Sequence, residues 1–326
     1  MKSVARSLAD DMPKLNAAAE KAVDGNRVPW PRRVAASLML PREHGAWAML
    51  LMPYLVGTLV AGWGGWSSLL LVVAILALFA GSRPLEVALQ HAGRPHVSLQ
   101  GETIGVTAAV RDYGAENREI RRRAIVHLAV DLGLGAAAGL LLLIAFRRWD
   151  LMAIGLVAGA ALALQLPLKR LRWDRGWPAR LLSIAALSAT GPAAYYASSG
   201  ALGHQAVAVW WLSFLYSGAS VFYVRLVYQP PARLKSGIAQ EQRSQAGRQL
   251  LIYLSSAVLS VVPLAAVGWM PLLALVALLP TFAKGIWAWA NPDYRPTLKQ
   301  VGMAEIGHSS LFALLAVVTI ASWRIG

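Results

Sequence analysis

Apolar residues occur along this chain in long blocks, separated either by short polar turns or by longer basic segments. The blocks are about 17 to 23 residues long, which is the length that an α-helix needs to cross a hydrocarbon core of roughly 30 Å. They do not show the alternation over about ten residues that marks the strands of a membrane β-barrel. Since backbone polar groups in lipid must be satisfied within their own segment, the blocks predict transmembrane helices.

The pattern predicts an all-α membrane protein with nine transmembrane helices in a bundle. Connections that follow odd-numbered helices are short, and those that follow even-numbered helices are long and basic. Residues 1–40 have mixed charge and no signal-peptide pattern, so we predict a partly disordered cytoplasmic tail before a single transmembrane domain at 41–326. The predicted spans are roughly 44–63, 68–82, 124–146, 151–168, 181–198, 206–226, 249–268, 271–290 and 302–323.

The basic residues predict the orientation of the bundle. Of the 31 Lys and Arg residues, all but Arg147, Arg148 and Arg324 fall in the tail to Arg42, in 83–123, 169–180 and 225–248, or in the stretch from Lys284 to Lys299. The connections 83–123, 169–180, 227–248 and 291–300 are therefore predicted to lie on one side of the membrane. Positive residues collect on the cytoplasmic side, so the N-terminus is predicted inside and the C-terminus outside a bacterial plasma membrane. The net charge of +15 then reflects topology and attraction to anionic lipids, and no nucleic-acid partner is expected.

Two stretches carry the ionisable residues that fall closest to the apolar core. Glu43 and His44 open the first span, and Glu305 and His308, three residues apart on one helix face, lie about one turn into the ninth. If the first and ninth helices are neighbours, these four candidate catalytic residues form one cluster. Such a cluster can transfer a proton, bind a divalent metal or lock two helices together by hydrogen bonds. No Cys is present and no ligand-spacing motif appears, so no metal site is predicted.

A second group of candidates is cationic and lies at the cytoplasmic ends of even-numbered helices. Arg83 ends the second span, Lys169 and Arg170 end the fourth, and Tyr223 and Arg225 end the sixth. These residues can be ordinary cytoplasmic anchors whose long side chains reach the interface. They can also form a binding pocket for an anionic head group such as phosphate or diphosphate, because Arg offers paired donors.

Glycines recur in the third and fourth spans. Gly133, Gly135 and Gly139 lie in the third, and Gly155 and Gly159 lie in the fourth. Small residues let helix backbones approach closely within a membrane. The pattern therefore predicts close helix contact at these glycines.

Several stretches resemble the YwiC-like family of bacterial membrane proteins. The segment Pro41-Arg42-Glu43-His44-Gly45-Ala46-Trp47, continuing to Pro53, is similar to the opening signature of that family. The stretches from Gly218 to Arg225 and from Leu298 to Ser309 agree with the same family. The resemblance extends over about residues 40–323 and implies no established activity.

The layout is more distantly similar to the UbiA superfamily of intramembrane prenyltransferases, which are nine-helix bundles with a cytoplasmic N-terminus. The stretch from Leu166 to Arg180 resembles their Pro-Leu-Lys-Arg segment. Those enzymes carry Asp-rich Mg²⁺ motifs after the second and sixth helices, where this chain has 82–86 and 223–228, with Glu86 as their single carboxylate. If the protein is an enzyme, the resemblance implies a transferase without those motifs, and no cofactor follows from the residues.

Three classes of function agree with these observations. The first is an enzyme or binding protein for an amphiphilic anion, bearing a prenyl group or a phosphate, in a cavity open to the cytoplasm. The second is a transporter, although no helix pair shows matching Gly or Pro breaks in two halves. The third is an accessory subunit of a membrane complex, and the sequence names no protein partner.

Overall fold

The computed structural model describes residues 44–92, 104–164, 177–228 and 237–323, and these form helices without any strand. Glu43, Lys169 and Arg170 lie outside the described residues, as does the predicted tail at 1–40. The helices are α2 (His44–Ala61), α3 (Trp66–Ala80), α4 (Ser82–Ala92), α5 (Ile104–Ile144), α6 (Asp150–Ala163), α8 (Trp177–Ser188), α9 (Thr190–Ser199), α10 (His204–Val227), α11 (Gly237–Ala266), α12 (Leu275–Ala290) and α13 (Leu298–Trp323).

Six stretches in the described part of the chain are long and apolar enough to cross a membrane. Two shorter apolar helices, Trp47–Ala61 and Asp150–Ala161, accompany them. The predicted count of nine spans and the predicted orientation therefore stay predictions. The six stretches are Trp66–Leu89, Glu119–Ile144, His204–Val227, Gln240–Ala266, Leu272–Ala290 and Lys299–Trp323.

The described residues divide into two compact units. One contains 83–92 and 104–126, from α4 and the first half of α5, and the other contains 44–82 and the described residues from 127 to 323. The first unit corresponds to the segment that the sequence analysis treated as a cytoplasmic loop. Most of that segment is helical, with the exposed pair Arg123 and Glu119 at 2.8 Å on α5.

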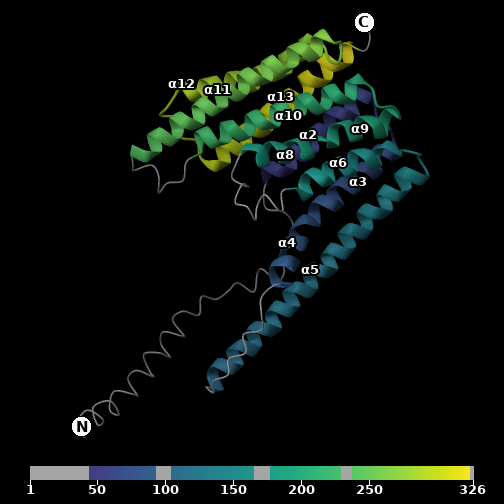
Figure 1. Ribbon diagram of the computed structural model, residues 1–326, viewed down its shortest axis with the longest axis vertical. Coiled ribbons are helices and arrows are strands. Elements are labelled where there is room, and N and C mark those ends of the chain that lie inside the picture. The colour runs from purple at the N-terminus through teal and green to yellow at the C-terminus, as the bar shows by residue number, and fades with distance from the viewer. Residues whose placement is uncertain (1–43, 93–103, 165–176, 229–236, 324–326) are drawn as a thin grey trace. The chain divides into compact units, whose positions relative to one another are not determined.

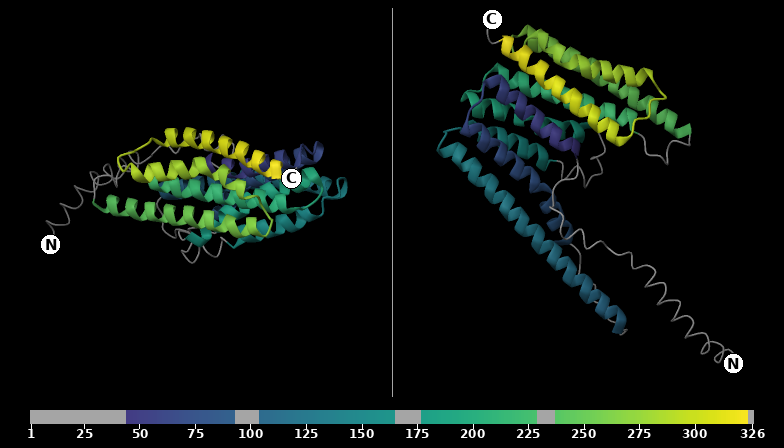
Figure 2. Two further views of the ribbon diagram at one scale, coloured as in Figure 1. Left: turned by 90° about the horizontal axis from the view of Figure 1, so that it is seen from above. Right: turned by 180° about the vertical axis from the view of Figure 1, so that it is seen from behind.

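In the larger unit, α10, α11, α12 and α13 run side by side (Figures 1 and 2). Their facing side chains form a core in which Leu212, Phe312 and Ile320 are at most 1% exposed. Helix α2 packs against α9, α10 and α13. The first and last predicted spans are therefore neighbours, as the sequence analysis expected.

The closest backbone approach lies between α2 and α9. A Cβ atom added to Gly57 would lie 2.1 Å from the carbonyl oxygen of Gly191, and one added to Gly191 would lie 2.8 Å from the Val209 side chain. Only glycine fits at such distances. Close packing of small residues thus occurs at positions that the sequence did not single out, and among the predicted glycines at Gly135, where an added Cβ would lie 3.2 Å from the Leu78 side chain.

The predicted fifth span is interrupted at Ala189, where α8 ends and α9 begins. Pro192 explains the interruption. It has no N–H to donate to the carbonyl of Ser188, and its ring would collide with that carbonyl in a continuous helix. At this break, the hydroxyl of Thr190 donates to the carbonyl of Leu50 at 2.8 Å. This hydrogen bond links the start of α9 to α2.

Candidate functional site

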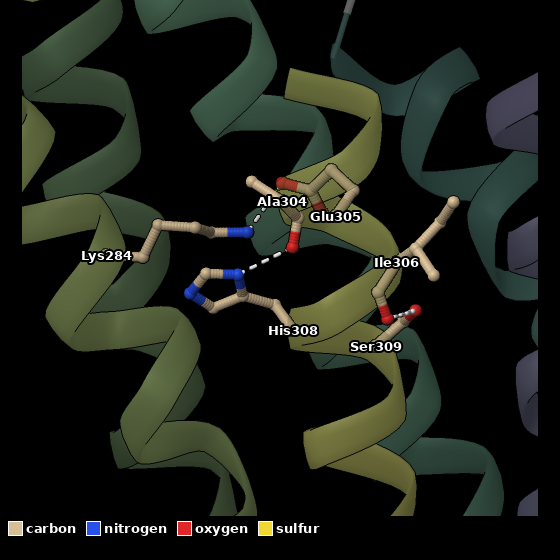
Figure 3. Close-up of polar contacts among 6 residues, drawn as sticks. All are labelled: Lys284, Ala304, Glu305, Ile306, His308 and Ser309. Carbon is tan, nitrogen blue, oxygen red and sulfur yellow. Dashed lines mark hydrogen bonds and ion pairs between the residues drawn. The ribbon is translucent and has the colours of Figure 1, made fainter. Parts of the chain in front are cut away.

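The most polar part of the larger unit lies where α10 and α12 end and α13 begins. Lys284 points from α12 toward Glu305 of α13, and its Nζ donates to the carboxylate at 2.5 Å (Figure 3). The Lys284 side chain is only 5% exposed and that of Glu305 is 21% exposed. Because removing charges from water costs several kcal/mol per ion, this pair needs support from its surroundings.

Tyr223 of α10 provides part of that support. The Lys284 ammonium lies over the Tyr223 ring, 4.3 Å from its centroid, and Tyr223 is 2% exposed. The negative face of an aromatic ring attracts a cation by about 2 kcal/mol when the contact is shielded from water. Lys284 therefore joins three helices, with its charge held between a carboxylate on α13 and a ring on α10.

His308 lies one turn after Glu305, on the same side of α13 as Lys284 (Figure 3). Its Nδ1 donates to the carbonyl of Ala304 at 2.7 Å, because a carbonyl oxygen can only accept. In a neutral imidazole this leaves Nε2 as the acceptor. Glu305 and His308 share a helix face as predicted, but each is held by a different partner.

Tyr216 of α10 lies between this polar region and the apolar core. Its ring stacks on Phe312 of α13, with centroids 4.2 Å apart and the planes 13° from parallel. Its hydroxyl lies beside Ser220 and Ser309, close enough to Glu305 to be affected by that charge. Beyond the stack, apolar residues of α10 and α13 belong to one core cluster.

Four buried hydroxyls on α10 and α12 form no hydrogen bond of good geometry within the described chain. A buried hydroxyl without a partner costs about 1–3 kcal/mol, and native proteins contain few of them. Three of these hydroxyls are on α10 and one is on α12, one turn before Lys284. They are Ser213, Tyr216, Ser220 and Thr281.

Arg243 of α11 fills a neighbouring position and is 7% exposed. Its guanidinium donates to the carbonyls of Ala288 at 3.1 Å and Asn291 at 3.0 Å, where α12 ends, and to that of Leu226 at 3.5 Å, near the end of α10. The last carbonyls of a helix have no partner in the helix and carry partial negative charge. The contacts assign Arg243 a structural role, as a cap shared by two helix ends.

Arg225 faces away from the ion pair and is exposed. Its Nη1 donates to the side chain of Gln249 at 2.8 Å. Arg180, near the start of the neighbouring helix α8, lies close enough for its charge to act on Arg225. Within the described chain no carboxylate forms an ion pair with either arginine, so two guanidiniums of like charge face the same side of the bundle.

An apolar cavity of about 420 Å³ lies beside α8 in the larger unit. Gly135 and Gly139 of α5 and Gly155 and Gly159 of α6 form part of its wall. A Cβ added to Gly139, Gly155 or Gly159 would meet nothing within 4 Å. The prediction of close helix contact at these three glycines is therefore wrong: the missing side chains leave space. The remaining wall comes mainly from α3 and α6, with smaller parts from α5, α8 and α9, and Leu78, Ala158, Leu187 and Ala193 are among its residues.

The grouping of the predicted cationic residues stays a prediction, because Lys169 and Arg170 lie outside the described residues and Arg83 belongs to the other unit. Arg83 pairs with Glu86 on α4 at 2.7 Å, with both side chains about half exposed. Tyr223 contacts Lys284, whereas Arg225 faces outward. His44 begins α2, but its side chain, like Glu43, lies outside the described part of the structure, so the four-residue Glu–His cluster stays a prediction.

Lys284 is the main residue that the sequence analysis missed. It was counted with the cytoplasmic charges, although it falls within the predicted span 271–290, six residues before Ala290. A charge inside a membrane span is a functional candidate by default, so this position carried a usable signal. The role of Tyr216 had no such signal, because it depends on how α10 and α13 face each other.

In the part of the chain that the structure describes, no three His, Cys, Asp or Glu side chains are grouped so that they could hold a metal ion. The long apolar helices define the class as an α-helical, multi-pass membrane protein. The family model described as YwiC-like protein matches residues 40–195, which confirms the predicted family resemblance over that part of the chain. The match ends within α9, so the two later stretches and the Lys284–Glu305 pair lie beyond it. No curated protein and no solved structure matches the chain.

Proposed function

We propose that this protein binds an amphiphile with an anionic head group, with the hydrocarbon chain in the apolar cavity beside α8 and the head group at Arg180 and Arg225. The observation that carries the proposal is this cavity, which opens between apolar helices and is lined almost entirely by aliphatic carbon. A hydrocarbon chain is the natural occupant of such a space within a bilayer. Prenyl and acyl chains both satisfy this description.

The two arginines support the choice of an anionic head group. Arg guanidinium groups bind phosphate oxygens through paired N–H donors. Two guanidiniums that repel each other are stabilised by an anion placed between them. Since neither forms an ion pair with a carboxylate within the described chain, both are available for this role.

Helix α8 connects the two parts of the proposed site. Leu187 lines the cavity and Arg180 lies seven residues earlier, so both fall on the same face of the helix. Seven residues correspond to roughly 10 Å along the helix axis. An amphiphile lying along this face would place its head near Arg180 while its chain enters the cavity.

The test is binding of a prenyl monophosphate to purified, delipidated protein, with EDTA present. Arg180→Ala and Arg225→Ala should each weaken binding about ten- to a hundredfold, because each removes a charge-assisted contact of about 1.5–3 kcal/mol. Gly155→Leu should weaken binding by filling the cavity without disturbing the fold, because its added side chain enters open space. Arg147→Ala, in the exposed turn between α5 and α6, is the matched control.

Two results would contradict the proposal. One is unchanged affinity in Arg225→Ala and Gly155→Leu together. The other is equal binding of the prenyl phosphate and the uncharged prenyl alcohol, which would mean that the cavity takes hydrocarbon without selecting a head group. Binding that requires Mg²⁺ would place the head group at a site other than the two arginines.

A further inference from the structure

The polar region around Glu305 has one property that a purely structural ion pair does not need. A structural lock is most stable when all of its polar groups are satisfied. Here the Lys284–Glu305 pair lies among hydroxyls, on two different helices, that have no hydrogen-bond partner within the described chain. One of these hydroxyls belongs to Tyr216, a residue that is 6% exposed and lies near enough to Glu305 to be affected by its charge.

We propose that Glu305 is a proton-exchange site, separate from the amphiphile site, which takes up and releases one proton while Lys284 remains its charged partner. In this step the carboxylate gains a proton from water and becomes a neutral carboxylic acid, and no other bond is made or broken. The net charge of the pair changes from zero to +1. The ring of Tyr223 then stabilises the ammonium that has lost its counter-ion.

Hydroxyl groups suit both charge states of such a site. A hydroxyl donates to a carboxylate and, after rotation, accepts from a carboxylic acid. The Tyr216 hydroxyl lies beside those of Ser220 and Ser309 and is near enough to Glu305 to be affected by its charge. Because the hydroxyls of Tyr216 and Ser220 form no hydrogen bond of good geometry within the described chain, they can reorient when Glu305 gains or loses its proton.

Glu305 is within reach of the exterior of the bundle. The Glu305 side chain is 21% exposed, and His308, which retains Nε2 as an acceptor in its neutral form, is partly exposed beside it. On the opposite side the Tyr216–Phe312 stack and the aliphatic core close the path. The arrangement fits a site that exchanges protons with one side of the membrane, and it does not form a continuous channel.

The other titratable groups near Glu305 come from the helices packed on α13. Helix α2 also contacts α13, but the hydroxyl of its Tyr54 donates to the carbonyl of Ser68 on α3. The 3-10 helix Leu272–Ala274 contributes only apolar residues. Among the described side chains, those near Glu305 are Lys284 from α12, Tyr216 and Tyr223 from α10, and His308 on its own helix, with Tyr294 beside Tyr223.

Infrared difference spectroscopy across a pH series tests the proposal on the full-length protein in liposomes. A protonated carboxyl has a carbonyl stretch that a carboxylate lacks, so among the bands of the 16 acidic residues wild type should show one that Glu305→Gln abolishes. Lys284→Met should move its midpoint upward by about one to three pH units, because it removes the opposite charge that favours the carboxylate. Glu241→Gln, at an exposed position of α11, should leave the band unchanged.

Tyr216→Phe keeps the test decisive if Lys284→Met fails to fold, because it retains the ring stack and removes only the hydroxyl. It should shift the frequency of the Glu305 band, whereas Tyr253→Phe, whose hydroxyl donates to the carbonyls of Phe214 and Leu215, should not. Persistence of the band in folded Glu305→Gln, or no frequency change in Tyr216→Phe, would overturn the proposal and leave the pair as a structural lock. Loss of amphiphile binding in the arginine variants with this band intact separates the two sites.

Discussion

Lys284 shows how one residue can combine several interactions that no other side chain offers together. Its four-carbon stem lies among buried residues, its ammonium reaches Glu305, and the face of Tyr223 lies beneath the charge. Arg would present a wider planar group in the same space, and Met would remove the charge. The position therefore depends on both the length and the charge of lysine.

Breaking this pair from one side should be costly. Lys284→Met leaves the Glu305 carboxylate without its partner, so we expect a loss of about 3–5 kcal/mol in unfolding free energy, while the double variant Lys284→Met with Glu305→Gln recovers most of it. Unfolding in mixed micelles measures both. Arg83→Gln removes half of an exposed pair and should cost less than about 1 kcal/mol. Equal costs at the two pairs would contradict the burial argument.

Part of the site could be predicted from single residues. Glu305 and His308 stand out because ionisable residues are rare at membrane depth, and their spacing places them on one face. Their partners are a different matter, since the contact with Lys284 depends on the rotation of α12 against α13. In the sequence, Ser220 and Thr281 are ordinary small polar residues. That their hydroxyls lack a partner becomes visible only when three helices are placed together.

Side chains on one helix often form hydrogen bonds to backbone groups at the end of another helix. Arg243 of α11 satisfies carbonyls at the ends of α10 and α12, so three helices meet at one guanidinium. The break between α8 and α9 is likewise fastened by a hydrogen bond from Thr190 to α2. Contacts of this kind fix the helix ends rather than their apolar middles.

Arg243→Met should therefore destabilise the α10–α11–α12 group. Hydrogen bonds to a charged donor contribute about 1.5–3 kcal/mol, and the substitution leaves buried carbonyls without a partner. Unfolding in mixed micelles should show a loss of at least that size. Arg248→Met changes an exposed arginine on the same helix and should have little effect, so similar losses in both variants would contradict the capping role.

The glycines separate into two kinds that the sequence does not distinguish. Gly57→Ala forces a methyl group against the backbone of Gly191, and overpacking of this kind costs about 1–3 kcal/mol. Gly139→Ala adds a methyl group to open space and should be neutral or stabilising, because alanine favours a helix interior. Thermal unfolding of the two variants in one detergent measures the difference, and equal midpoints would contradict the packing described.

The helices themselves were the most predictable feature, because an apolar block of bilayer length has few other possible structures. Each of the nine predicted blocks overlaps an observed helix. The prediction was wrong about most of 83–123, since amphipathic and highly charged helices such as α4 and the start of α5 have no apolar block to reveal them. It also missed the break at Ala189, which Pro192 causes within an otherwise apolar run.

At the scale of the whole molecule, the orientation remains a prediction that single cysteines can test. The chain has no Cys, so Ala201→Cys and Ser236→Cys each introduce one thiol. An impermeant reagent should label Ala201→Cys in intact cells and Ser236→Cys only after permeabilisation, as the distribution of basic residues requires. Labelling of Ser236→Cys from outside would reverse the orientation.

The two proposed sites differ in how much of each lies within the part of the chain that matches the family. The apolar cavity is lined by residues within 40–195, the part that matches the YwiC-like protein family. Arg225 and the Lys284–Glu305 pair lie beyond it. The amphiphile site thus combines a wall from the matched region with a head-group arginine from outside it, while the proton-exchange site belongs wholly to the later helices.

Ligand binding by this bundle is tested most directly by mass spectrometry of the small molecules that stay with the protein when it is extracted gently from its own membrane. We expect an anionic amphiphile enriched above its share of the bulk lipid in wild type and in Arg147→Ala. The same molecule should be lost from a double variant, Arg225→Ala with Gly155→Leu, that still folds. Bulk lipid composition in wild type, or equal retention by the double variant, would contradict the claim that this bundle binds such a ligand.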